Sequence, residues 1–295
     1  MRKIVLAVTF LVLIGVAPAF AFIPWVGSLS SDGGTTWINN VQHFDWASGG
    51  VGAALPTGLE PFNPNAPAVG QTFDFLYQAR LAGLEDPNKN TVLWPGLNDS
   101  FEVTFVAVLP EMVTGLNTVG GLNVATFATL AGGQWFMYLD DAPNADSVTG
   151  MGFDDGHLVA SGSFLEGQPT TFAELSPTTG FGAFFIDGLI ATAHPVNPDE
   201  NFFRPAFQDD GSVWMYDIHL QGTVIEEAAT IIPTAFFRSR DGEGNISEIM
   251  TDPDWAFFSV DASSQFSVIP EPSTVILLGL GLLGLAGYSR KRFQK

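Results

Sequence analysis

Hydrophobic and polar residues alternate along many short stretches of this chain. Between Phe101 and Leu109 every second residue is apolar, while Glu102 and Thr104 begin the opposite face. Residues 214–221 repeat the pattern, with apolar side chains at the even positions and mostly polar ones at the odd positions. Successive side chains of a strand point to opposite sides, so this period of two predicts half-buried β-strands.

Seven further runs have the same strand character. They are residues 72–77, 124–130, 134–139, 157–164, 183–191, 234–237 and 255–260. Glycine-containing turns separate them, for example at 131–133, 154–156, 209–211 and 241–244, where glycine adopts positive φ without a steric penalty. Nine or ten short strands at this spacing predict an all-β body, either an antiparallel β-sandwich or a jelly-roll-like fold.

Two stretches depart from this pattern. Residues 55–69 contain four prolines, which cannot donate a hydrogen bond to a strand ladder, so we expect a surface loop there. Residues 225–232 are compatible with a short helix that ends before Pro233.

The composition restricts the class of protein. The 295 residues include 46% hydrophobic side chains, which is enough for a folded core, and no cysteine, which excludes disulfides and thiolate metal sites. Asp and Glu number 31 against 11 Lys and Arg, a net charge of −20. Nucleic acid is therefore not an expected partner, because phosphate backbones are bound by clustered cations.

The N-terminus has the pattern of an export signal. Arg2 and Lys3 precede an apolar run from Ile4 to Val16. Ala19 and Ala21 then form the small-residue spacing that signal peptidase reads, so residues 1–21 are predicted to be a signal peptide cleaved after Ala21.

The C-terminus combines a proline-rich break, an apolar run and a basic tail. The apolar run from Thr274 to Tyr288 is predicted to be a transmembrane helix of about 22 Å, shorter than a hydrocarbon core of about 30 Å. The basic tail is expected to stay cytoplasmic and stop transfer. It consists of Arg290, Lys291, Arg292 and Lys295.

The order of these C-terminal features resembles the PEP-CTERM sorting signal of exported bacterial proteins. The motif itself is Pro270, Glu271, Pro272, Ser273 and Thr274. The resemblance implies that residues 270–295 are recognised by an exosortase, which removes the tail while the protein is transiently held in the inner membrane. It also implies delivery to the cell surface or extracellular matrix.

The segment between the two signals, residues 22–269, is predicted to be one exported β-rich domain. Five cations and 30 acids remain in it, so its formal charge is −25. A body this acidic repels anionic polymers unless cations are present, and divalent ions are the natural counter-charge.

A candidate calcium loop lies at residues 241–252. Its oxygen-bearing side chains are Asp241, Glu243, Asn245, Glu248 and Asp252. Hard cations prefer carboxylate and amide oxygens, but the sixth position holds Ile246 where an EF-hand needs glycine, so a glycine-rich turn remains the alternative. Asp140, Asp141, Asn144 and Asp146 form a second, weaker cluster.

No catalytic motif stands out. The four histidines, His43, His157, His194 and His219, lack the i, i+4 spacing of a helical zinc site. Adjacent acids such as Asp154 and Asp155 point to opposite faces of a strand, so their adjacency does not indicate a glycosidase pair. We expect a protein that is not an enzyme and requires no cofactor, with calcium as the one candidate ligand.

Aromatic residues are abundant, with 26 Phe and 7 Trp. They predict a large core, with sugar stacking by Trp25, Trp37, Trp46 or Trp94 as the alternative.

Three segments of the body, residues 43–47, 73–79 and 184–188, resemble the flocculation-associated PEP-CTERM subgroup. That resemblance implies a secreted matrix protein that associates with exopolysaccharide in biofilms or flocs. A carbohydrate-binding or glycan-cleaving β-sandwich protein is the alternative.

Overall fold

The computed structural model describes residues 23–64, 66–176, 179–190, 198–205, 213–224, 232–237, 248–252 and 255–269. These residues form strands and loops, and none of them lies in an α-helix. In this part of the chain there is accordingly no helix with the length and apolar character needed to span a bilayer. Every pair of named strands is antiparallel.

Seventeen strands follow one another in the described residues. They are β1 (Ile23–Pro24), β2 (Gly27–Leu29), β3 (Ile38–Val41), β4 (His43–Thr57), β5 (Thr72–Glu85), β6 (Thr91–Val92), β7 (Glu102–Val119), β8 (Leu122–Thr129), β9 (Gln134–Asp140), β10 (His157–Phe164), β11 (Pro169–Ser176), β12 (Thr179–Ile190), β13 (Phe203–Arg204), β14 (Val213–Val224), β15 (Ala235–Phe236), β16 (Ile249–Met250) and β17 (Ala256–Ile269).

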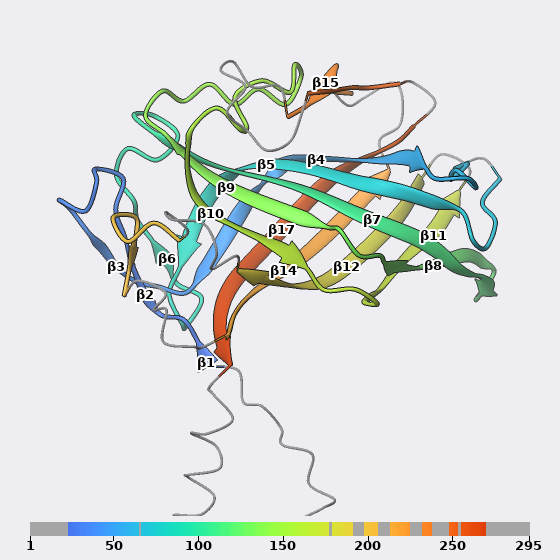
Figure 1. Ribbon diagram of the computed structural model, residues 1–295, viewed down its shortest axis with the longest axis horizontal. Helices are drawn as coiled ribbons and strands as arrows, with labels where there is room; N and C mark the ends of the chain where they lie inside the picture. Colours follow the sequence, from blue (N-terminus) through green and yellow to red (C-terminus); the bar gives the residue numbers. More distant parts are fainter. Residues whose placement is uncertain are drawn as a thin grey trace, which may run out of the picture.

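The main sheet closes on itself (Figure 1). Eight strands pair in a ring in the order β4, β5, β7, β9, β10, β12, β14 and β17, and β17 pairs again with β4. β7 and β12 each extend beyond this ring. Their far ends are linked through two further strands, because β7 pairs with β8, β8 with β11, and β11 with β12. Strands that return to their starting point leave few unpaired edges, which protects the sheet from pairing with other chains.

Aromatic rings fill the interior of the closed sheet. Trp46 packs on Phe105 with ring centroids 5.1 Å apart, and Trp135 packs on Tyr216 at 4.4 Å. The indole Nε1 of Trp46 and the hydroxyl of Tyr216 each donate a hydrogen bond of 2.8 Å to Ser264 Oγ. Because the polar atoms of Trp46 and Tyr216 have a partner, these two rings are buried at little cost, whereas the indole Nε1 of Trp135 has no hydrogen-bond partner.

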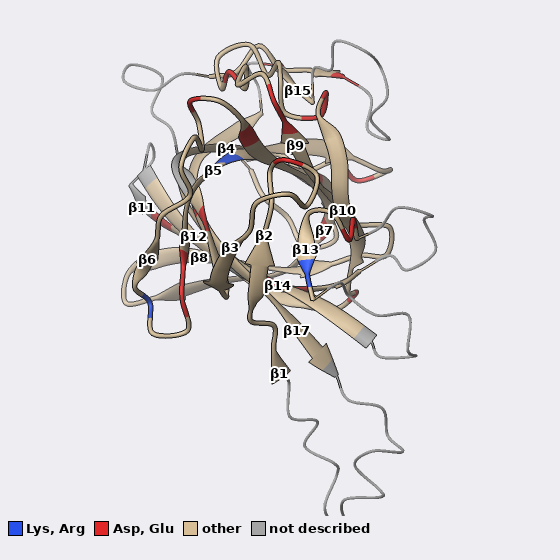
Figure 2. Cartoon of the chain, turned by 90° about the vertical axis from the view of Figure 1, so that its left-hand side faces the viewer, with Lys and Arg blue, Asp and Glu red and all other residues tan. Residues whose placement is uncertain are grey.

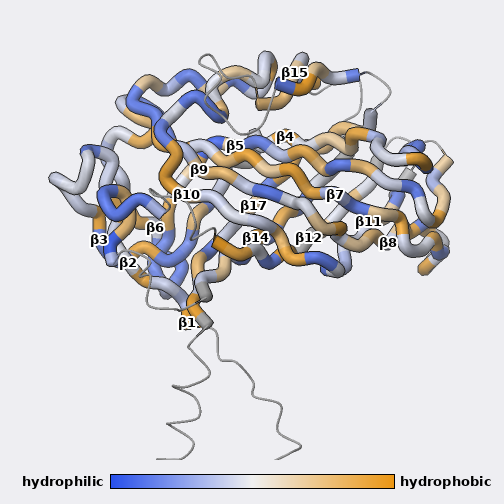
Figure 3. The backbone as a smooth tube through the Cα atoms, in the orientation of Figure 1, coloured by the Kyte–Doolittle hydropathy of each residue, from blue (hydrophilic) through white to orange (hydrophobic). Residues whose placement is uncertain are grey.

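A second apolar cluster lies outside the ring. Figure 1 shows the segments that cover it, on the side of the ring formed by β4 and β5. The segment around β15 and the loop of residues 141–156, which joins β9 to β10, cover the outer side of β4, β5, β7 and β9. Phe153, Phe236 and Phe237 pack there against Leu76 and Val106. These strands are therefore buried on both faces, while other strands alternate between hydrophobic and hydrophilic positions (Figure 3).

A small three-stranded sheet of β13, β2 and β3 lies across one end of the molecule (Figure 2). Next to it, β1 pairs with the end of β17, with Ile23 opposite Val268. The first and last described residues are therefore neighbours in space.

The structure confirms the all-β prediction, and each of the nine predicted runs coincides with or overlaps a strand. A sandwich or jelly roll is not confirmed, because the strands pair in one ring rather than in two facing sheets. Residues 58–64 and 66–71 lie in the predicted proline-rich loop, but Pro56 lies in β4 opposite Phe73. The helix expected at 225–232 falls almost entirely outside the described residues.

Candidate functional site: a polar outer sheet face

Polar side chains form a continuous row across five neighbouring strands of the ring. Asp187 on β12 lies opposite Asp217 on β14, which lies opposite Gln265 on β17. Gln265 in turn lies opposite His43 on β4, and His43 opposite Glu85 on β5. Because neighbouring strands are about 4.8 Å apart, these side chains form one surface, which we call the polar outer face.

A second row extends the polar outer face along the strands. His219 on β14 lies opposite Ser263 on β17, which lies opposite Asp45 on β4. The residues between these positions, such as Ile218 and Phe44, are buried inside the ring. The strict alternation of strands therefore places every polar side chain of both rows on the outside.

Like charges face each other within the first row. Burial raises the pKa of Asp217, the hydroxyl of Ser267 opposes this, and the facing Asp187 raises the pKa further. Ser267 Oγ donates a hydrogen bond of 3.1 Å to Asp217 Oδ2. Two carboxylates directly opposite each other on adjacent strands are unfavourable unless a proton or cation lies between them.

The polar outer face is hollowed beside this pair. A depression of about 290 Å³ lies among His43, Lys89, Asp187, Asp217 and His219. Lys89 is already engaged, because its Nζ lies 3.2 Å from Glu85 Oε2. The depression therefore offers mainly carboxylate, imidazole and hydroxyl groups to a ligand, a set suited to cations and to hydroxyl-rich molecules.

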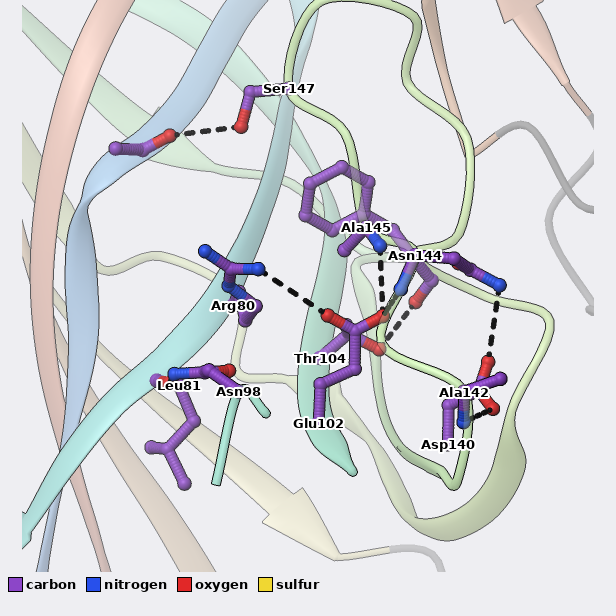
Figure 4. Close-up of polar contacts among 12 residues, drawn as sticks. Arg80, Leu81, Asn98, Glu102, Thr104, Asp140, Ala142, Asn144, Ala145 and Ser147 are labelled. Carbon is purple, nitrogen blue, oxygen red and sulfur yellow. Dashed lines mark hydrogen bonds and ion pairs between the residues drawn. The ribbon is translucent and has the colours of Figure 1, made fainter. Parts of the chain in front are cut away.

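A separate group of carboxylates is buried under the 141–156 loop (Figure 4). Glu102, at the start of β7, is fully buried, and its Oε1 accepts N–H bonds from Asn144 at 2.6 Å and Ala145 at 2.8 Å. Arg80 Nη1 lies 3.8 Å from Glu102 Oε2. Burial raises the pKa of Glu102, and the two N–H donors and Arg80 oppose that rise. The arrangement fastens the loop to the sheet.

Asp154 in the same loop is only 1% exposed. Neither of its carboxylate oxygens has a hydrogen-bond partner, and burial, reinforced by the charge of Asp155, raises its pKa to about 7. Asp154 is thus expected to exchange its proton near neutral pH.

The second predicted calcium cluster is only partly assembled. The Asn144 amide Nδ2 lies 3.5 Å from Asp140 Oδ2 and 3.4 Å from Asp155 Oδ2. Asp146 instead closes its own turn by accepting hydrogen bonds from Val148 N–H and the hydroxyl of Thr149. Across the described ranges no three His, Cys, Asp or Glu side chains are placed to hold a metal ion.

The first predicted calcium loop is largely outside the described residues, since Asp241, Glu243 and Asn245 are not among them. Glu248 and Asp252 flank β16, where the Asp252 carbonyl accepts the N–H of Trp255. The calcium prediction therefore stays a prediction.

The described histidines do not gather into one site. His157 Nε2 lies 2.9 Å from Asp199 Oδ2, whereas His43 and His219 lie on the polar outer face. His194 falls outside the described residues.

Most of the tryptophans considered for sugar stacking belong to the core. Trp25, Trp46 and Trp94 are buried, and Trp37 alone of the four is partly exposed. The core interpretation is thus confirmed for three of them.

Sequence reasoning missed the pairing of Asp187 with Asp217. Alternation indicates that both point outward, but it carries no information about which strands are neighbours or in which register they pair.

One comparison with known proteins finds a match. The family model for the PEP-CTERM protein-sorting motif matches residues 268–292, which confirms the predicted sorting signal. The motif supports an exported protein that an exosortase processes and that reaches the cell surface. No curated protein and no solved structure matches the chain. The residues of the motif from Pro270 onward, and the signal-peptide residues Ala19 and Ala21, lie outside the described part of the chain.

Proposed function

We propose that the body of this chain, whose PEP-CTERM motif supports exosortase-targeted export to the cell surface, acts non-enzymatically in the extracellular matrix. In this proposal the polar outer face associates with anionic exopolysaccharide through divalent cations. Such association would hold polysaccharide around cells in a biofilm or floc.

The facing carboxylates of Asp187 and Asp217 are the observation that carries the proposal. A divalent cation between two such groups relieves their repulsion, and its remaining coordination positions accept oxygens from a second molecule. A bridging ion takes only part of its ligands from the protein, so no complete cage of protein carboxylates is required. The net charge of −25 between residues 22 and 269 adds a general need for counter-ions.

The position of the sorting motif is compatible with this role. The matched segment begins at Val268, one residue before the end of β17. The closed sheet therefore leads directly into the sorting segment, and β1 pairs beside it at the same end.

The test is co-sedimentation of the exported protein with purified acidic exopolysaccharide, in millimolar calcium and in chelator. We expect calcium to increase the bound fraction. The double variant Asp187→Asn, Asp217→Asn should lose most of that calcium-dependent increase. The matched control is Glu60→Gln, Glu166→Gln, which removes the same charge from two exposed positions outside the polar outer face and outside both predicted calcium clusters.

Equal calcium dependence in the two double variants would contradict a role for the polar outer face. Shortened polysaccharide after incubation would instead support the glycan-cleaving alternative. In cells, deletion of the gene should reduce aggregation or matrix retention and leave the soluble glycan intact.

A further inference from the structure

A second depression lies on the small sheet of β13, β2 and β3. Figure 2 shows this sheet at one end of the molecule. It measures about 420 Å³ and is lined by residues that include Ser28, Asn39, Asn40 and Arg204. This volume falls within the range of small-ligand sites. Its lining differs from the polar outer face, because it contains a cation and two amides and no carboxylate.

Arg204 lines this depression, and its guanidinium is available to a ligand. In the described part of the chain, Arg80 and Lys89 each lie within 4.0 Å of a glutamate carboxylate, whereas Arg204 has no such partner. The Arg204 guanidinium instead lies over the ring of Trp37, 5.8 Å from the ring centre. A cation–π contact holds the guanidinium in place and leaves its N–H donors able to bind an anion.

The side-chain amides of Asn39 and Asn40 are placed to form hydrogen bonds with a ligand. The Ser28 hydroxyl donates a 2.7 Å hydrogen bond to Asn39 Oδ1, which orients the amide and leaves its NH₂ group for another partner. Asn40 lies beside it with φ of 65°, a left-handed conformation that turns the backbone sharply between β3 residues. Two neighbouring exposed asparagines thus line one rim of the depression.

We propose that this depression binds a carboxylate-bearing sugar unit, a uronate, within an acidic polysaccharide. A guanidinium binds a planar carboxylate through two parallel hydrogen bonds, and the asparagine amides match the hydroxyl groups of a sugar ring. The partly exposed indole of Trp37 adds an apolar wall. The inference rests on the proposed function, from which it takes acidic polysaccharide as the partner. It adds a second contact between the protein and the polysaccharide, one that needs no metal ion.

The experiment is titration calorimetry of the exported protein with a defined oligogalacturonate, in the presence of chelator. Chelator removes any cation bridging at the polar outer face, so that binding reports on direct contacts. We expect binding of the oligogalacturonate and none of a neutral oligoglucan of equal length.

Arg204→Gln should weaken that binding at least about tenfold, because it removes the charge-assisted bonds. Arg80→Gln is the matched control, since it removes one positive charge at a position that does not line this depression and is already paired with Glu102, and it should change the affinity less than about twofold. Asn40→Gly should weaken binding severalfold while keeping the backbone, because glycine accepts positive φ.

Two results would overturn the inference: no binding of oligogalacturonate by the wild-type protein in chelator, or equal losses in Arg204→Gln and Arg80→Gln. Calcium-dependent sedimentation of exopolysaccharide, and its loss in Asp187→Asn, Asp217→Asn, would be unaffected by either result. Failure of this site and failure of the proposed function are therefore distinguishable.

Discussion

Glu111 is a carboxylate held inside the closed sheet. It is fully buried in β7, where its Oε2 accepts a 2.8 Å hydrogen bond from the hydroxyl of Thr170 on β11 and its Oε1 has no partner. Burial raises the pKa of Glu111 to about 8, and the bond from Thr170 opposes that rise. At neutral pH the group is consequently mostly protonated in the folded protein and ionised in the unfolded chain.

This difference makes stability depend on pH. The folded state holds the Glu111 proton more tightly, so its stabilising effect is complete below the ordinary pKa of 4.5 and is lost as pH rises toward about 8. We expect the free energy of unfolding to fall by about 3 to 4 kcal/mol between pH 5 and pH 8 through this residue. Glu111→Gln should abolish this contribution to the decrease in the free energy of unfolding. Denaturant unfolding at several pH values measures it.

The exposed Glu166 provides the control, because Glu166→Gln should leave the pH dependence as in the wild type. Some pH dependence should persist in Glu111→Gln, since Asp154 also has a raised pKa, about 7. An unchanged pH slope in Glu111→Gln would show that the buried carboxyl does not titrate in this range.

The alternation of residues along a strand predicts the direction of a side chain more reliably than it predicts whether that side chain is buried. Glu102 and Thr104 were predicted on the face of their strand opposite the apolar residues, and they do lie there, yet both are buried. The reason is the 141–156 loop, which places backbone donors on Glu102 and a carbonyl on the hydroxyl of Thr104. A covering loop from a distant part of the chain leaves no trace in the strand's own alternation.

At the scale of elements, the ring closes through a short seam between β10 and β12. Only three residue pairs join these strands, from Gly162 opposite Ile190 to Phe164 opposite Gly188. A Cβ atom on Gly162 would lie 1.9 Å from the carbonyl oxygen of Leu189 and 2.7 Å from the ring of Trp135. The seam therefore requires a residue without a side chain at this point.

Gly162→Ala is expected to destabilise the protein by about 2 kcal/mol or more, because backbone and indole must move apart to admit the methyl group. Thermal or denaturant unfolding measures the loss. Gly83→Ala, in β5, is the control: an added Cβ there meets nothing within 4 Å, so stability should stay within about 1 kcal/mol of the wild type. Similar losses in the two variants would argue against a tight seam.

At the scale of the whole molecule, the main feature is its excess of negative charge. Acidic residues outnumber basic ones throughout the described chain (Figure 2), and residues 22–269 carry a formal charge of −25. Repulsion among these charges destabilises the compact state and is reduced by salt.

We expect sodium chloride to raise the midpoint of thermal unfolding, and millimolar calcium to raise it further at equal ionic strength. The additional rise reflects bound ions, which stabilise the folded state by mass action. Melting curves in calcium, in chelator and in matched sodium chloride measure it. An identical midpoint in calcium and in sodium chloride would contradict calcium binding both by the loop of residues 241–252 and by the polar outer face.

Export and processing also belong to this scale. The order of signals at the two ends of the chain indicated the route before any fold was known, and the match at residues 268–292 confirms the C-terminal signal. The polar outer face was not foreseen, although Asp217 and His219 were assigned to the polar face of their predicted strand. The missing information was the register of β12, β14, β17 and β4.

The sequence by itself determined the class of fold, the position of most strands and the sorting address, because alternation, turn residues and linear signals are all local properties of the chain. Only the tertiary structure decided that the sheet closes, that Glu111 lies inside it, and that Asp187 faces Asp217 while Arg204 lies beside Asn39 and Asn40. These facts depend on strand pairing between residues far apart in the chain. Such pairing is fixed by packing of the whole core, here by the aromatic rings inside the ring of strands, rather than by any short segment.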